Sequence, residues 1–212
     1  MKNQNIILNP KVPIDPSSNT IDRWIPPMYN TGFITNPNLL INSNFFINQR
    51  GDTAYKGNGY SVDRWKGLRE NQIIFRIPDD GVIVDCHEQF AGIEQLIEIP
   101  DKPYIRNLMV SFNIEVIMGN VKSSVIAGRR NSVFGYTDAL NSNSSNNIEY
   151  SVKLNGYHHK YYSVRFETVN GEYSIFKLKW VKLEFGKTVT QYVTPNMKDE
   201  IKSCLQYYIV SR

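Results

Sequence analysis

The chain has 212 residues, of which 41% are apolar, and carries 24 Lys and Arg against 20 Asp and Glu. A chain of this length can bury roughly 70% of its unfolded surface, which favours one main domain plus an arm. Its charges are scattered rather than grouped in runs, which argues against a nucleic-acid-binding protein.

The first residues contain a single apolar run, Ile6 to Leu8, which is too short for a signal peptide. No later stretch is long enough to span a membrane. We therefore expect a soluble protein that is made in a cytoplasm and does not insert into a membrane.

Residues 1 to 37 contain six prolines and no alternating run that could build a sheet, so we expect an extended arm. Two pieces of this arm resemble the segment that follows it. Residues 5–9 (NIILN) match residues 38–42 (NLLIN), and residues 20–24 (TIDRW) match residues 61–65 (SVDRW). The similarity indicates either a shortened duplication of the opening unit or chance.

From Gln72 onward, apolar residues alternate with polar ones, the pattern of β-strands with one face in a core. Residues 73–77 and 82–86 flank the turn Pro78-Asp79-Asp80-Gly81 and predict a hairpin. Further strands are expected at residues 108–116, 148–154 and 162–166. Between the last of these and the next strand, Asn170-Gly171 predicts a second hairpin.

Near Trp180 the alternation changes phase. Phe176, Leu178 and Trp180 share one face, whereas Val181 and Leu183 carry the apolar pattern on the other parity. One extra residue would restore the register, so we expect a β-bulge or a change of sheet here. We expect Trp65 and Trp180 to lie in the core.

The last segment has the features of a helix. Thr194 is the expected N-cap and Pro195 the first helical residue. Met197, Ile201, Leu205 and Tyr208 fall on one apolar stripe. Many short strands and one short helix predict a β-sandwich.

The chain's opening and closing segments carry a family resemblance. Residues 38–65 contain NLLIN, then FFINQRG and finally YSVDRW, and residues 180–186 (WVKLEFG) and 204–208 (CLQYY) close the chain. This combination resembles a domain of bacteriophage tail and fibre proteins. The resemblance implies an all-β fold: an antiparallel jelly-roll β-sandwich related to carbohydrate-binding modules, with an extended N-terminal arm and one short C-terminal helix.

The resemblance also implies a domain division and a function. Residues 1–37 would be the arm, for attachment or oligomerisation, and residues 38–212 the sandwich. The protein would be a non-enzymatic virion component, a tail or head fibre assembled in the host cytoplasm, that binds host surface polysaccharide. The arm would bind other virion proteins. Uncovered edge strands and the threefold symmetry of many fibres favour a homotrimer.

Two other classes of function stay open. One is a purely structural collar, decoration or adaptor protein without a glycan ligand, and the other is an enzyme. The sequence contains no Gly-x-Ser-x-Gly elbow and no phosphate loop, and the adjacent acids Asp79 and Asp80 fit a turn better than a glycosidase pair. Cys86, Cys204 and the adjacent His158 and His159 fit no metal spacing. We expect no catalytic residue, metal or cofactor.

Two groups of residues are candidates for ligand binding. Tyr157, His159 and Tyr161 belong to the run YHHKYY, in which alternation places Tyr161 opposite Tyr162. Exposed aromatic side chains stack on sugar rings or on a partner protein, and the alternative is an aromatic edge strand. The acid, guanidinium and indole of Asp63-Arg64-Trp65 suit a sugar site, whereas the alternative is a core Trp beside a turn fixed by Asp and Arg.

Overall fold

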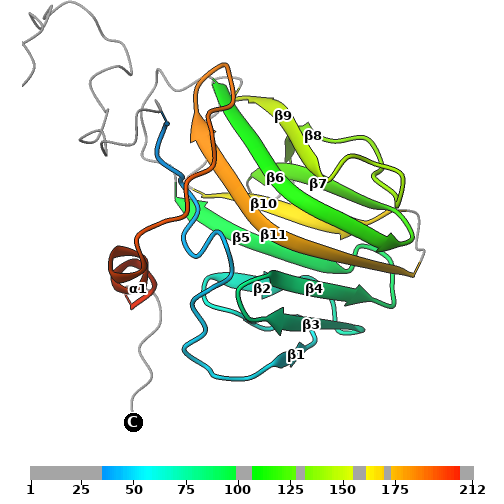
Figure 1. The fold of residues 1–212 in the computed structure, drawn as a ribbon. Helices are drawn as coiled ribbons and strands as arrows, with labels where there is room; N and C mark the ends of the chain where they lie inside the picture. Colours follow the sequence, from blue (N-terminus) through cyan, green and yellow to red (C-terminus); the bar gives the residue numbers. More distant parts are fainter. Residues whose placement is uncertain (1–34, 99–106, 128–131, 155–160, 170–172, 206–212) are drawn as a thin grey trace, which may run out of the picture.

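The computed structural model describes residues 35–98, 107–127, 132–154, 161–169 and 173–205. Two antiparallel sheets face each other, and one helix follows them (Figure 1). The six-stranded sheet has the order β1 (Ala54–Lys56), β3 (Gln72–Ile77), β4 (Gly81–Cys86), β11 (Ser174–Phe185), β6 (Asn107–Met118) and β9 (Asn147–Lys153). The five-stranded sheet has the order β2 (Trp65–Gly67), β5 (Gly92–Glu98), β10 (Tyr161–Thr168), β7 (Val121–Ala127) and β8 (Ser132–Tyr136). The helix is α1 (Met197–Leu205).

The strands from β4 to β11 form a jelly roll. β4 pairs with β11 and β6 with β9 in one sheet, while β5 pairs with β10 and β7 with β8 in the other. The pairs are therefore nested, as if one long hairpin had been rolled up across both sheets. The expected jelly-roll sandwich is confirmed.

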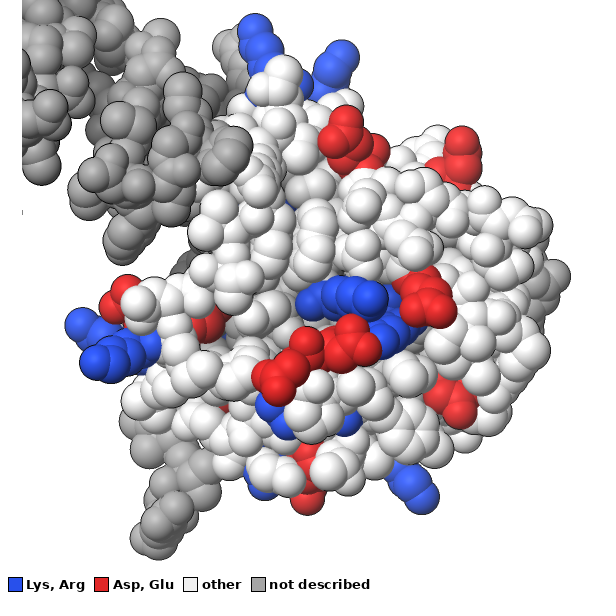
Figure 2. Space-filling model, viewed as in Figure 1, with Lys and Arg blue, Asp and Glu red and all other residues white. Residues whose placement is uncertain are grey.

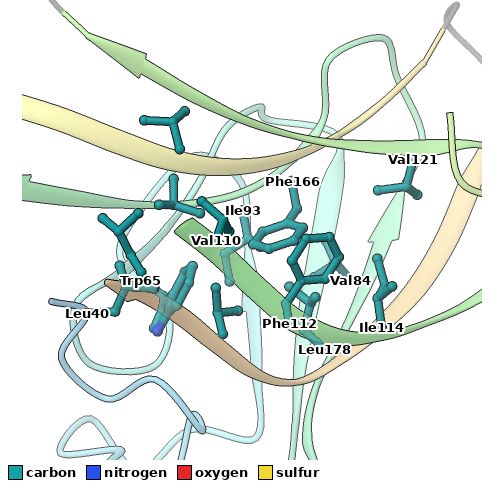
Figure 3. Close-up of a cluster of buried hydrophobic side chains, with 14 of the residues drawn as sticks. Leu40, Trp65, Val84, Ile93, Val110, Phe112, Ile114, Val121, Phe166 and Leu178 are labelled. Carbon is teal, nitrogen blue, oxygen red and sulfur yellow. The ribbon is translucent and has the colours of Figure 1, made fainter. Parts of the chain in front are cut away.

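The core lies between the sheets and follows from the alternation in the sequence. On β6 the side chains of Leu108, Val110, Phe112 and Ile114 are buried, whereas Glu115 is exposed. Phe112 meets Phe166 of the opposite sheet edge to face, with ring centroids 4.8 Å apart (Figure 3). Burial of these apolar side chains is the main stabilising term for such a sandwich.

The change of phase near Trp180 is a β-bulge, as predicted. The register of β11 against β6 shifts between Leu178 and Trp180, and Val181 and Leu183 return to the core. The shift turns Trp180 to the outer face, where it is half-buried and stacks on Tyr192 with ring centroids 4.5 Å apart. The prediction that Trp180 lies in the core was wrong, because the extra residue precedes it rather than follows it.

One of the two predicted hairpins forms. β3 and β4 pair through the turn at residues 78–80, although Ile74, and not the face of Ile73 and Phe75, points into the core. Asn170-Gly171 falls outside the described residues, but the strands that flank it, β10 and β11, lie in different sheets. The second hairpin prediction was wrong, because a jelly roll crosses between its sheets at this step.

The edges of both sheets are short or covered. β1 and β2, at one side of the sandwich, have three residues each. At the other side β8 lies against β9, since a Cβ added at Gly135 would come within 2.8 Å of the carbonyl oxygen of Ser151. In the described part of the chain, β8 and β9 therefore lie next to each other, whereas β1 and β2 are short edge strands.

The helix begins later than its sequence suggests. The side chain of Asn196 accepts a hydrogen bond from the backbone N–H of Lys198 at 2.9 Å, so Asn196 is the cap in place of Thr194. The apolar stripe of Met197, Ile201 and Leu205 is exposed, and Tyr208 falls outside the described residues. In the described part of the chain, no helix is long and apolar enough to cross a membrane.

Candidate functional site

The first residues of the opening motif bind to β11. The amide of Asn38 donates to the carbonyl of Val181 at 2.9 Å and accepts from the backbone N–H of Leu183 at 3.0 Å. The backbone N–H of Leu39 donates to the carbonyl of Leu183, and Leu40 is buried. The motif is thus a short segment docked on β11.

Asn42 connects the three parts of this motif. Its buried amide donates to the carbonyls of Ile47 and Asp63, at 2.8 and 2.9 Å, and accepts from the N–H of Ile47. Its own carbonyl accepts the indole N–H of Trp65 at 2.9 Å. Asn tolerates the left-handed backbone at this position, where φ is 53°.

Asp63 and Trp65 also have structural environments. The carboxylate of Asp63 is buried, accepts from the backbone N–H of Gln49 at 3.3 Å and lies 3.6 Å from the guanidinium of Arg50. Trp65 is fully buried, so its ring cannot stack on a sugar. These contacts support the core-and-turn alternative for Asp63-Arg64-Trp65.

The other candidate residues lie mostly beyond the described structure. Tyr157 and His159 fall outside the described residues. Tyr161 is the first residue of β10, where its backbone is in register with Glu98 of β5. These three residues stay predictions.

A different set of side chains converges on the outer face of the five-stranded sheet. The registers place one residue of each strand in a single line across it, which we call the cross-strand row: Lys66, Glu94, Arg165, Ser124 and Tyr136. Neighbouring strands lie about 4.8 Å apart, so the row is about 19 Å long. The row therefore offers an extended surface rather than a single point of contact.

Ion pairs fix the middle of the row. The guanidinium of Arg165 donates to one oxygen of Glu94 at 2.9 and 3.3 Å, and the hydroxyl of Ser163 donates to the same oxygen at 2.7 Å. Arg165 also lies 3.7 Å from Glu167, which pairs with Lys122 at 3.3 Å. Because the acids and bases compensate each other, the face holds fixed hydrogen-bonding groups with little net charge.

Apolar side chains border these polar groups. Leu96, Val133 and Tyr136 are exposed, Tyr136 most of all at 65%. Ser124 is buried beside Arg165, and its hydroxyl has no hydrogen-bond partner among the described residues. Polar groups fixed beside an exposed aromatic ring suit a ligand that has both hydroxyls and apolar C–H faces.

The six-stranded sheet presents a different outer face. Figure 2 shows basic and acidic side chains next to one another in the middle of that side, with few charges around them. Lys177 and Lys179 both pair with Asp80 on this sheet. The contact of Lys177 with Asp80 lowers the pKa of that carboxyl. The two lysines thus share one carboxylate on this face.

Groups suited to metal or redox chemistry lie apart. Within the described ranges, no three His, Cys, Asp or Glu side chains come close enough together to hold a metal ion. Cys86 and Cys204 are buried free thiols, and burial raises the pKa of each to about 12. A thiol with so high a pKa is a poor nucleophile at neutral pH.

No family model and no curated protein matches the chain. Among solved structures, the chain is similar to a Stig cyclase, Fisc, from Fischerella sp. TAU, with 12% identity and a TM-score of 0.49 over 72% of this chain and 100% of that one. It is also similar to a xylan-binding module, CBM15, with 9% identity and a TM-score of 0.43 over 66% and 100%. For xylanase 10C from Cellvibrio japonicus the identity is 12%, the TM-score 0.44 and the coverage 63% of this chain but only 28% of that one. At these identities the likeness concerns the fold alone, and a shared fold does not decide a function.

The cross-strand row is absent from the sequence predictions for a physical reason. Alternation identifies the outward residues of β5, β7 and β10 individually, such as Glu94 and Arg165. Alternation does not tell which strands are neighbours or in which register they pair. Strand order and register together bring Lys66 and Tyr136, which are 70 residues apart, into one line.

Proposed function

We propose that this protein is a non-enzymatic component of a phage virion, a tail or head fibre, whose jelly-roll domain binds host surface glycan along the cross-strand row. The observation that carries this proposal is the row itself. Arg165 and Glu94 hold each other in its middle, and Tyr136 is exposed at its end. The resemblance of the opening and closing motifs to phage tail and fibre proteins supports the virion role.

The chemistry of the row suits a sugar chain. Sugar hydroxyls both donate and accept hydrogen bonds, and Glu94, Arg165 and Ser163 offer both kinds of partner in fixed positions. The exposed ring of Tyr136 offers a surface for the C–H face of a pyranose. Groups that are already oriented lose little entropy when the ligand binds.

Titration of the protein against an array of bacterial surface polysaccharides tests this site. Tyr136→Ala should weaken binding at least tenfold and leave the melting temperature unchanged, because the side chain is exposed. Glu149→Ala is a matched control, since Glu149 is exposed on β9 of the opposite sheet. Equal loss of binding in both variants, or none in Tyr136→Ala, would contradict the assignment.

The N-terminal arm is the proposed attachment element to other virion proteins, in a homotrimeric fibre. An extended segment supplies main-chain pairing to a neighbouring sheet or groove. Thr35 and Asn36 belong to the sandwich by their contacts, since the amide of Asn36 donates to the carbonyl of Phe185 at 3.0 Å. The cut that tests the arm is therefore before residue 35.

A purely structural collar, decoration or adaptor protein is the second candidate function, and the same deletion separates the two. Removal of residues 1–34 should leave a soluble domain that keeps glycan binding but no longer enters particles. A truncated protein that assembles at normal copy number would contradict the attachment role. Full-length protein that assembles but binds no polysaccharide would favour the purely structural function.

A further inference from the structure

The helix carries an apolar stripe that nothing in the described structure covers. Val193, Met197, Ile201 and Leu205 follow one another at intervals of four residues and are exposed. Residues four apart on a helix lie on the same side, so the last three form one continuous ridge. We call these four residues the α1 stripe.

The side of α1 that adjoins the stripe faces the sandwich. Cys204 is buried, and the carboxylate of Glu200 accepts the backbone N–H of Asn42. Figure 1 shows α1 at the side of the two sheets, with the chain that follows residue 35 beside the segment that leads into the helix. The position of α1 is thus fixed by other residues, and the α1 stripe is left available for a further contact.

The N-terminal arm joins the described structure next to this stripe. The hydroxyl of Thr35 donates to the carbonyl of Gln191 at 2.9 Å, and the backbone N–H of Asn36 donates to the hydroxyl of Thr190 at 3.0 Å. Gln191 is two residues before Val193, where the stripe begins. Thirty-four residues precede Thr35 in the sequence.

We propose that residues 24–33 of the same chain cover the α1 stripe. This segment contains Trp24, Ile25, Met28, Tyr29 and Phe33, and Pro26 and Pro27 keep it from forming a helix of its own. Ten extended residues span up to about 33 Å. The nine residues of α1 rise about 13 Å, and the four residues before them add at most about 14 Å. The segment is long enough to follow the whole stripe from its anchored end.

This contact is independent of glycan binding, because α1 belongs to neither face of the five-stranded sheet. It assigns two roles to the arm. Residues 24–33 seal an apolar surface on their own domain, and residues 1–23 remain for attachment to a particle. Covering an apolar ridge of this kind also protects the free protein from self-association before assembly.

Oxidation of methionine by hydrogen peroxide, followed by peptide mass spectrometry, tests the proposal with an internal control. Met197 on the stripe and Met118 at the end of β6 have nearly the same exposed fraction in the described structure, 46% and 43%. In the full chain, Met197 should oxidise at least fivefold more slowly than Met118. Equal rates for the two methionines in the full chain would overturn the proposal.

Variants of the arm test whether the arm, and not another contact, protects Met197 from oxidation. Replacing Ile25, Tyr29 and Phe33 together by Ser keeps the chain at full length and should raise the rate of Met197 to that of Met118. Removal of residues 1–34 should do the same. Protection of Met197 that persists in both variants would show that the arm does not cover the stripe. Protection that vanishes on dilution of the wild type would show that a second copy covers it. Either result would refute the proposal.

Discussion

The carbonyl of Asn42 accepts the indole N–H of Trp65 at 2.9 Å, and the two residues lie 23 positions apart in the sequence. This bond links the docked opening segment to the first residue of β2, which is buried in the core. The most recognisable residues of the opening motif therefore hold the two sheets and the segment between them in place. Their role is structural, and it makes the motif a marker of fold rather than of ligand.

Asn42→Ala should lower the free energy of unfolding by about 2 to 5 kcal/mol. The substitution leaves the carbonyl of Asp63 and the N–H of Ile47 without the amide of Asn42 in a buried place, whereas the carbonyl of Ile47 keeps the backbone N–H of Asp63. Urea denaturation measures the change. Asn42→Gly separates this loss from backbone strain, since Gly accepts a φ of 53°. A Gly variant as stable as wild type would contradict the role of the amide.

Trp65→Ala should cost about 3 to 5 kcal/mol, because it leaves a large cavity at a fully buried position. Trp180→Ala should cost less, about 1 to 2 kcal/mol, since it removes mainly the stacking contact with Tyr192. Chemical denaturation of both variants compares them directly. Equal losses would mean that Trp180 contributes to stability like a core residue.

Lys182 and Glu184 form a buried ion pair at 3.2 Å, with side chains 2% and 1% exposed. Burial lowers the pKa of Lys182, and the charge of Glu184 opposes this shift. Lys182→Met should cost about 3 to 5 kcal/mol, because it leaves a buried carboxylate uncompensated. The double variant with Glu184→Gln should recover part of this loss in a double-mutant cycle. Additive losses would show that the two side chains do not interact.

Stability should depend on pH through Glu200. Desolvation raises the pKa of Glu200 above its ordinary value of 4.5, against the hydrogen bonds from the backbone of Asn42 and Ser43. Between the raised pKa and 4.5 the folded state binds the proton and the unfolded state does not. The contribution of Glu200 to stability therefore increases as pH falls through this window.

Comparison of wild type with Glu200→Gln isolates this effect. The variant lacks the titrating group but keeps an acceptor for the N–H of Asn42. Its stability relative to wild type should be greatest at neutral pH and should fall as pH drops towards 4.5. A difference in melting temperature that stays constant from pH 7 to pH 4 would contradict the raised pKa.

The sequence predicts the strands well, because alternation is a local property. Leu108 to Val116 occupy the face expected for them, and the bulge near Trp180 is where the phase changes. The predicted orientation of the Trp180 side chain was wrong, because an extra residue on either side of Trp180 would restore the alternation. In the structure the extra residue precedes Trp180. The predicted helix cap was wrong because Asn196, which also has a capping side chain, accepts the backbone N–H of Lys198 in place of Thr194.

Long-range pairing explains the remaining differences. Asn170-Gly171 is a strong local signal for a hairpin, but the nested pairing of the jelly roll sends β10 and β11 to different sheets. The cross-strand row likewise depends on neighbours that are far apart in the chain. Local patterns cannot reveal either feature, and this is why the candidate site emerged only from the registers.

The docking of Asn38 on Val181 and Leu183 determines when the protein can fold during its synthesis. The opening motif leaves the ribosome before β11 does, because the strand that receives it is made more than 140 residues later. At 5 to 20 residues per second, the motif waits roughly 7 to 30 s for its partner. Until then Leu40, Phe45 and Trp65, all buried in the finished domain, have no core to enter. A ribosome that stalls before β11 would therefore hold an unfinished sandwich with its apolar opening segment exposed to chaperones and proteases.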